Sequence, residues 1–239
     1  MYHKVCRDAT QFGKFTISPE EFEADLRFLQ NSHYTPVTMA DLIAFVHDGG
    51  DLPAHPILLS FDDGYFGDYH YVFPLACAYE TPIVTSIIGS VTDEYSNEGR
   101  TDIIYPHLLW SQISEMAASG YFEFQNHSYD LHCVRGGTQG ARRRNGESPD
   151  AYQTRLSSDL THLQDSISAH TGQNPSTFTY PFGAKSDSSD QILQALGFSA
   201  SLMTEAKQNL ICRGEAACLF SLGRILRPHG TSLASILSD

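Results

Sequence analysis

Short apolar runs alternate along this chain with stretches in which apolar residues recur every three or four positions. The continuous runs 56–61 (PILLSF) and 82–88 predict buried strands. Shorter strands are predicted over 121–125, 177–180 and 198–203. The periodic stretches predict helices over 18–29, from 38 to about 48, 111–119, 148–170 and 188–196. Repeated β–α units indicate an α/β fold with a parallel sheet, either open or closed into a barrel.

Helix-start signals support this division of the chain. Ser18-Pro19-Glu20-Glu21 places an N-cap serine before a proline and a glutamate in the first helical turn, and Ser148-Pro149 repeats the serine–proline pair. No internal repeat or linker interrupts the alternation, so we predict one domain over residues 1–239.

Composition and charge narrow the classes of protein to consider. The 239 residues are 41% hydrophobic, enough for a sizeable core, and 15 Lys and Arg against 28 Asp and Glu give a net charge of −13. An acidic surface repels phosphate backbones, which argues against a nucleic-acid partner. No apolar run is long enough to span a bilayer, and residues 1–5 lack the pattern of a signal peptide. We therefore expect either a cytoplasmic protein or a chain whose export segment lies upstream.

The cysteines give no strong signal. Five are present without a CxxC pair, which argues against a zinc ribbon and a disulfide framework. Cys212 and Cys218 could form a disulfide in an exported protein, but free thiols are the simpler expectation.

Three polar clusters follow predicted strands. They are 60–64 (SFDDG), 127–132 (HSYDLH) and 180–183 (YPFG). Taken singly, an Asp-Asp-Gly after a strand is most often a turn, and two histidines in a loop are most often incidental. The carboxyl ends of parallel strands meet at one edge of the sheet, however, and active sites of α/β folds lie there. We therefore expect these clusters to lie close together.

The clusters contain the residue types of a catalytic zinc site. Asp63, His127 and His132 offer one carboxylate and two imidazoles, which leaves a coordination position for water. A spacing of five residues turns about 140° around an α-helix, so the two histidines cannot share a helix face and must lie on a loop. Asp62, next to one ligand, could take the proton of that water.

These motifs resemble the polysaccharide deacetylases of carbohydrate esterase family four, also called the nodulation-protein-B homology domain. Residues 60–64 match the family's Thr/Ser-Phe-Asp-Asp-Gly motif, and His127-Ser128 with His132 matches its second motif. The wide histidine spacing, Tyr2-His3 and residues 180–183 resemble the branch that de-N-acetylates poly-N-acetylglucosamine. The resemblance extends from Tyr2 to about Ser235.

The resemblance implies a distorted (β/α) barrel of about seven parallel strands and a divalent metal ion, Zn²⁺ first, with Co²⁺ or Ni²⁺ as alternatives. The implied metal ligands are Asp63, His127 and His132. Asp62 would be the general base. The backbone N–H of Phe182 would help to stabilise the oxyanion, with Tyr180 among the residues that shape the acetyl pocket.

Two features depart from the family pattern. Thr179 stands where many members carry an arginine that orients the base, and Arg224 and Arg227 are candidates to replace it, with a solvated strand end as the alternative. The family's catalytic acid follows a Leu-x-His pattern, whereas this chain has one residue more over 226–229 (LRPH). We assign His229 as the acid, the alternative being a loop histidine.

Together these observations predict a metal-dependent hydrolase that removes N-acetyl groups from a polysaccharide containing N-acetylglucosamine. An O-acetyl xylan-type esterase would use the same residues. A catalytically weakened glycan-binding module is a third alternative, because of the missing arginine and the altered acid motif. The family is typical of secreted or cell-surface proteins. The sequence leaves the polymer, the oligomeric state and the compartment open.

Overall fold

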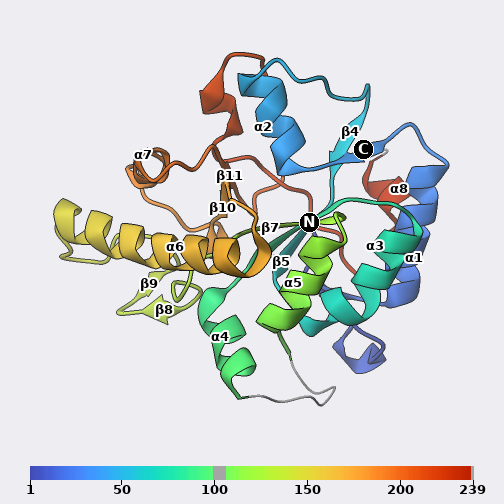
Figure 1. Cartoon of the computed structure of the whole chain (residues 1–239), viewed down its shortest axis with the longest axis horizontal. Coiled ribbons are helices and arrows are strands. Elements are labelled where there is room, and N and C mark those ends of the chain that lie inside the picture. The colour runs from blue at the N-terminus through green and yellow to red at the C-terminus, as the bar shows by residue number, and fades with distance from the viewer. Residues whose placement is uncertain (99–105, 238–239) are drawn as a thin grey trace.

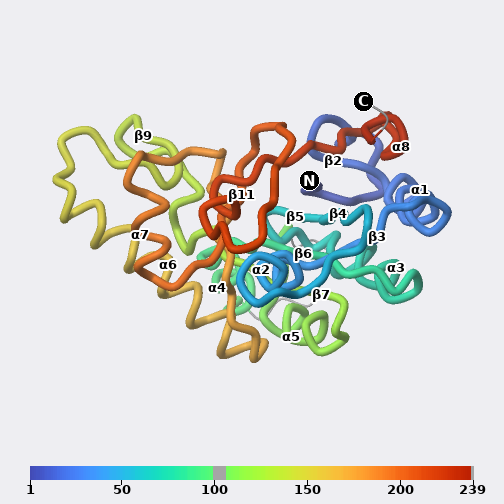
Figure 2. The backbone as a smooth tube through the Cα atoms, turned by 90° about the horizontal axis from the view of Figure 1, so that it is seen from above, coloured from blue at the N-terminus to red at the C-terminus, as the bar shows by residue number. Residues whose placement is uncertain are grey.

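A computed structural model describes residues 1–98 and 106–237. Its main sheet has five parallel strands in the order β11-β10-β7-β6-β5 and curls into a half barrel (Figure 2). The strands are β5 (Ser60–Asp63), β6 (Ile83–Ile87), β7 (Phe122–Asn126), β10 (Thr177–Thr179) and β11 (Ala200–Leu202). All five were predicted from their apolar patterns, and because they are parallel, their carboxyl ends lie at one edge.

The expected number of about seven barrel strands is not confirmed. Among the described residues, β3 (Thr35–Val37) and β4 (Pro56–Leu58) form a separate two-stranded parallel sheet. The predicted strand 56–61 is divided at Leu59, because its first half pairs with β3 and its second half, as β5, pairs with β6. Two further small sheets pair β1 (Lys4–Val5) with β2 (Thr16–Ile17), and β8 (Val134–Arg135) with β9 (Thr138–Gln139).

Helices surround the main sheet (Figure 1). They are α1 (Pro19–Gln30), α2 (Met39–His47), α3 (Phe73–Ala78), α4 (Gly89–Asn97), α5 (Trp110–Ala118), α6 (Pro149–Thr171), α7 (Ser189–Ala195) and α8 (Leu233–Ile236). Shorter helical turns are Ala9–Gln11, Asp68–Val72, Pro181–Gly183 and Ala216–Leu219. The predicted cap of α1 is present: the Glu21 N–H donates to the Ser18 hydroxyl, and the Glu21 carboxylate accepts from the Ser18 N–H. Within the described residues, no helix has the length and apolar character needed to cross a membrane.

Apolar side chains on both faces of the sheet hold the strands in place. Phe22 of α1 packs with Phe61 of β5 and Phe124 of β7, and all three are fully buried. Phe178 of β10 projects from the same face, where it packs with Leu156 of α6. On the opposite face, Val84 of β6 packs with Met39 of α2 and Leu202 of β11. Full burial of one such side chain contributes about 1.5–3 kcal/mol. The strand ends that carry polar residues therefore rest on a rigid support.

The segment before β1 is joined directly to β5. The Tyr2 N–H donates to the Ser60 carbonyl at 2.7 Å, and the Asp62 N–H donates to the Tyr2 carbonyl at 3.1 Å. The Tyr2 ring stacks on Phe61 with their centroids 4.8 Å apart. This pairing brings His3, the next residue, alongside Asp62.

Candidate active site

A cavity of about 600 Å³ opens at the carboxyl ends of the strands. Its lining brings together side chains from distant parts of the sequence: Met1, His3, Lys14, Phe15, Asp62, Asp63, Tyr65, His127, His132, Gln139, Phe182, Thr204, Ala206, Arg224 and Leu226. The three polar clusters predicted to meet at this edge are therefore all represented at one cavity.

The turn at the end of β5 fixes the conformation of Asp63. Asp63 has a φ of +73°, and Gly64 follows at +66°, both in the left-handed region. A Cβ atom at Gly64 would lie 2.9 Å from Cγ2 of Ile87, so this turn requires glycine for space as well as for conformation. The Nδ1–H of His107 donates to the Asp63 carbonyl at 3.1 Å. These contacts hold the Asp63 side chain toward the cavity.

The two histidines of the second cluster converge on Asp63, as predicted. The Nε2 atoms of His127 and His132 each lie 3.3 Å from Oδ1 of Asp63. The Nδ1–H of His127 donates to the Thr179 carbonyl at 2.7 Å, which leaves the lone pair of Nε2 free to bind a cation. His132 lies on the loop after β7, in agreement with the spacing argument.

This arrangement fits a divalent metal ion. The three potential ligand atoms lie within 4.8 Å of one another, and Asp63 Oδ1 is buried without a hydrogen bond. Burial raises the pKa of Asp63, but the neighbouring histidines outweigh it and lower the pKa overall. Burial and the charge of His127 lower the pKa of His132 to about 4. An ionised carboxylate and a neutral imidazole are the forms in which these side chains bind metals.

An arginine holds the predicted base from the far side. Nη1 of Arg224 lies 2.6 Å from Oδ1 of Asp62, and Nη2 lies 2.7 Å from Oδ2, a bidentate pair. Burial raises the pKa of the Asp62 carboxyl, but Arg224, together with His127 and His3, holds it well below its usual range. The prediction that Arg224 or Arg227 replaces the missing arginine is therefore confirmed for Arg224.

The other two positions in that prediction have structural contacts instead. Arg227 binds Asp25 through Nε at 2.8 Å and does not reach the cavity lining. The hydroxyl of Thr179 in β10 lies 2.7 Å from that of Ser86 in β6, and both side chains are buried.

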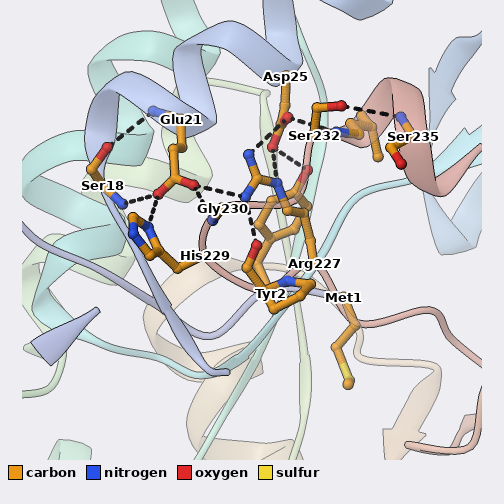
Figure 3. A network of polar contacts seen from close by, with 12 residues as sticks. Met1, Tyr2, Ser18, Glu21, Asp25, Arg227, His229, Gly230, Ser232 and Ser235 are labelled. Carbon is orange, nitrogen blue, oxygen red and sulfur yellow. Dashed lines mark hydrogen bonds and ion pairs between the residues drawn. The ribbon is translucent and has the colours of Figure 1, made fainter. Parts of the chain in front are cut away.

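The structure does not bring His229 into the site. Its Nδ1 atom lies 2.8 Å from a carboxylate oxygen of Glu21, at the start of α1 (Figure 3). The His229 ring also lies against Phe12. His229 is absent from the cavity lining. Arg227 turns inward to Asp25, and His229, two residues later, lies beside the start of α1. The assignment of His229 as the acid is corrected on this geometry.

His3 is the histidine that the sequence reasoning missed. Its Nε2 atom lies 4.0 Å from Oδ2 of Asp62, and its side chain lines the cavity. Nδ1 of His3 is buried without a hydrogen-bond partner. The Tyr-His pair at the start of the chain was the available signal, but only the pairing of Tyr2 with β5 shows why it lies here.

The third cluster contributes Phe182 and not Tyr180. Phe182 has a φ of +59°, its ring packs 4.3 Å from that of His132, and its side chain lines the cavity while 40% exposed. Tyr180 is fully buried, and its hydroxyl donates to Asp190 at 2.8 Å. Tyr180 is absent from the cavity lining, so it supports the loop from below and does not itself face a ligand.

Several curated proteins are similar to this chain. Poly-beta-1,6-N-acetyl-D-glucosamine N-deacetylase of Escherichia coli (strain K12) is 23% identical over 97% of the chain and 36% of that protein. The protein of the same name from Staphylococcus epidermidis is 21% identical over 82% of the chain and 64% of that protein. The chain thus spans less than two thirds of the length of these relatives.

Solved structures share the fold over nearly the whole chain. A de-N-acetylase from Aggregatibacter actinomycetemcomitans superposes with a TM-score of 0.82 at 26% identity, covering 99% of this chain and 97% of that one. IcaB from Ammonifex degensii gives 0.78 at 26% identity, covering 99% and 93%. The sequence pattern of the polysaccharide deacetylase family matches residues 49–201, more than half of the chain. With Asp62, Asp63 and the two histidines gathered at one cavity, the chain belongs to the polysaccharide deacetylase family.

Proposed function

We propose that this chain is a metal-dependent N-deacetylase of a polysaccharide containing N-acetylglucosamine. The observation that carries the proposal is the pairing of two adjacent aspartates with different partners. Asp62 is bound by Arg224, and Asp63 faces two histidine Nε2 atoms. One carboxylate is thus held ionised to accept a proton, while its neighbour is available as a metal ligand.

The residues divide the chemistry among them. Asp63, His127 and His132 would hold the ion, which as a Lewis acid would polarise the acetyl carbonyl and lower the pKa of water. Asp62 accepts the proton of the attacking water. The Phe182 N–H, which makes no hydrogen bond within the described residues, donates to the developing oxyanion.

His3 takes the role first assigned to His229. A general acid must reach the leaving amine from the same cavity in which the base acts, and His3 lines that cavity beside Asp62. His229 is occupied by Glu21 outside it. His3 therefore delivers the proton to the amine as the amide bond breaks.

The identity of the metal ion is inferred from the chemistry of its three potential ligands. Two imidazoles and one carboxylate form a set common to catalytic Zn²⁺ sites with a position left for water. Co²⁺ and Ni²⁺ accept the same ligands. Zn²⁺ is the ion we propose, with the other two as outcomes of metal replacement.

The N-acetylglucosamine substrate is inferred from the relatives, whose names specify a β-1,6-linked N-acetylglucosamine polymer. The missing arginine had suggested a weakened glycan-binding module, and Arg224 removes that reason because it binds the base in two places. The names of these relatives give no support for acetylated xylan, which remains the alternative substrate.

Acetate release tests this function. The purified chain would be incubated with β-1,6-linked N-acetylglucosamine oligomers and with acetylated xylan, before and after chelation and after return of Zn²⁺. We expect release from the oligomers that chelation abolishes and Zn²⁺ restores. Release from xylan alone would replace the proposal by an O-acetyl esterase, and no release from either substrate would overturn it.

A matched pair of histidine variants tests the acid. H3A should lower kcat by about 10²–10⁴, the usual contribution of a general acid. H229A should leave kcat near the wild-type value, because His229 contacts Glu21 and not the cavity. The reverse result would return the acid role to His229.

A further inference from the structure

We infer that Asn209 is a positioning residue for the deacetylation reaction, acting on Arg224 through the backbone of Gly223. This inference rests on the proposed function, because Arg224 matters to catalysis only if Asp62 is the base. Asn209 belongs to the long excursion between β11 and Arg224, a segment to which the sequence analysis gave no role.

The chain returns from that excursion as an additional strand-like segment beside β11. The Leu222 N–H donates to the Ser201 carbonyl at 2.8 Å, and the Met203 N–H donates to the Leu222 carbonyl at 2.8 Å. The Arg224 N–H then donates to the Glu205 carbonyl at 2.9 Å. These bonds have the pattern of a parallel strand pair. They pair the backbone groups of the segment that face β11, and leave those of Gly223 on the opposite side.

The amide of Asn209 provides the partner on the other side. The Gly223 N–H donates to Oδ1 of Asn209 at 2.9 Å, and Nδ2 of Asn209 donates to the Gly223 carbonyl at 2.8 Å. A side-chain amide carries the same donor and acceptor as a peptide group. Asn209 therefore binds Gly223 as one residue of a neighbouring strand would, on the side of the segment that faces away from β11.

Close packing of residues 205–209 on Gly223 makes this pairing specific. A Cβ atom at Gly223 would lie 2.7 Å from the Glu205 carbonyl oxygen and would also collide with the side chain of Lys207. Gly223 has no positive φ, so glycine is required here for space and not for conformation. The excursion can approach closely enough for Asn209 to reach both peptide groups because this residue lacks a side chain.

The position of Gly223 determines where the Arg224 guanidinium lies. Arg224 is 7% exposed, its Nε donates to the Met203 carbonyl at 2.8 Å, and its two Nη atoms bind Asp62. A buried side chain with all these bonds has little freedom to compensate for a shift of its own backbone. Loss of the Asn209 amide should therefore displace the base relative to the substrate, and a displacement of about 1 Å can cost 10² in rate.

A matched variant elsewhere in the sheet separates positioning from stability. Gln173 makes a similar pair of bonds to β7, although to two residues instead of one: its Oε1 accepts from the Phe124 N–H at 2.7 Å, and its Nε2 donates to the Phe122 carbonyl at 2.7 Å. Phe122 and Phe124 are the first and third residues of β7, whereas His127 follows its last residue. Q173A thus removes a pair of hydrogen bonds between a side-chain amide and a strand, but at a place away from the cavity.

The experiment compares kcat, KM, metal content and melting temperature for wild type, N209A and Q173A on an N-acetylglucosamine oligomer. We expect both variants to melt at lower temperature. The kcat of N209A should fall about tenfold, with KM and bound metal unchanged, whereas the kcat of Q173A should stay at the wild-type value. If N209A does not fold, N209D keeps the acceptor for the Gly223 N–H and should show the same direction of change.

A double-mutant cycle tests whether the effect passes through Arg224. In R224K, Asp62 has already lost its bidentate partner. Adding N209A to R224K should therefore change kcat by less than about twofold. An unchanged kcat in N209A, or an equal fold-loss in both backgrounds, would overturn the inference while leaving the proposed function intact. A wild-type chain that releases no acetate would overturn the proposed function and this inference with it.

Discussion

Arg224 and Arg227 lie three residues apart, and each binds a buried aspartate, yet the two pairs have different surroundings. Arg224 binds Asp62 beside a cavity of about 600 Å³, whereas Arg227 binds Asp25 in a network of polar contacts outside that cavity (Figure 3). The arginines are 7% and 4% exposed, so burial does not distinguish them. What distinguishes them is whether the carboxylate faces a space that a substrate can enter.

The Asp25 network leaves little room for chemistry. The Asp25 carboxylate accepts from the Tyr2 hydroxyl at 3.1 Å, from Arg227 Nε at 2.8 Å and from the Leu233 N–H at 3.2 Å. Burial raises the pKa of Asp25 despite Arg227. For Asp62, Arg224 and nearby histidines reverse the effect of burial and lower the pKa. Of these two arginine–aspartate pairs, the one at the candidate active site is thus the pair with histidines and an open cavity beside it.

Substitution of the two aspartates should give the largest contrast. D62N should keep the metal and lower kcat by about 10²–10⁴, because the amide cannot accept a proton from water. D25N should keep kcat per folded molecule and lower the melting temperature. Acetate release normalised to the folded fraction measures both. A D62N variant with near-wild-type turnover would require another base.

Removal of the second arginine should act on stability alone. R227M leaves Asp25 as a buried charge without its main partner, which typically costs about 3–5 kcal/mol in the free energy of unfolding. Turnover by the folded fraction should remain at the wild-type level, as urea unfolding and acetate release together would establish. A large loss of kcat in folded R227M would make the two pairs functionally alike.

Shortening the first arginine should act on rate. R224K keeps the positive charge but loses the bidentate contact with Asp62, so the proposed base is held by one hydrogen bond instead of two. We expect kcat to fall by about 10–10² with little change in KM. The same substitution at Arg227 is the control, and an equal loss of kcat in both variants would contradict the division of roles.

The smallest expected effect is on the pH dependence of stability, through Glu21, which contacts both Arg227 and His229. Burial raises the pKa of Glu21, but hydrogen bonds from the Ser18 and Gly230 N–H groups and from His229 and Arg227 outweigh it and lower the pKa to about 2. A carboxyl with a lowered pKa stabilises the folded state above its unfolded value, and this contribution disappears as the pH falls toward 2.

E21Q tests this contribution. It should lower the free energy of unfolding by about 1 kcal/mol at pH 7, where a charged hydrogen-bonded group is lost. The difference from wild type should shrink between about pH 4.5 and 2. Urea unfolding across this range measures it, and a difference that grows with acid would contradict the assignment.

Much of the fold and the metal-ligand group could be predicted from the sequence because both depend on local patterns. Apolar runs marked the five main strands, and the clusters after them identified Asp63, His127 and His132. Parallel strands end at a common edge, so sequence order alone was enough to bring these residues together.

The remaining residues depend on long-range pairing that no local pattern contains. His3 reaches Asp62 only because Tyr2 bonds to the edge of β5. His229 follows Arg227 away from the cavity because Arg227 turns to Asp25. Tyr180 was predicted to face the substrate, but its hydroxyl finds a partner in Asp190 inside the fold. In each case a single tertiary contact decides the role.

The central claim is that acetate is released at the Asp63, His127 and His132 site with Asp62 as base. Its most direct test is to remove metal from the protein and to measure acetate release from an N-acetylglucosamine oligomer while Zn²⁺ is titrated back. We predict that activity rises until one Zn²⁺ per chain is bound, and that D62N binds the same single ion without releasing acetate. Full acetate release by the metal-free protein, or by D62N, would contradict the account.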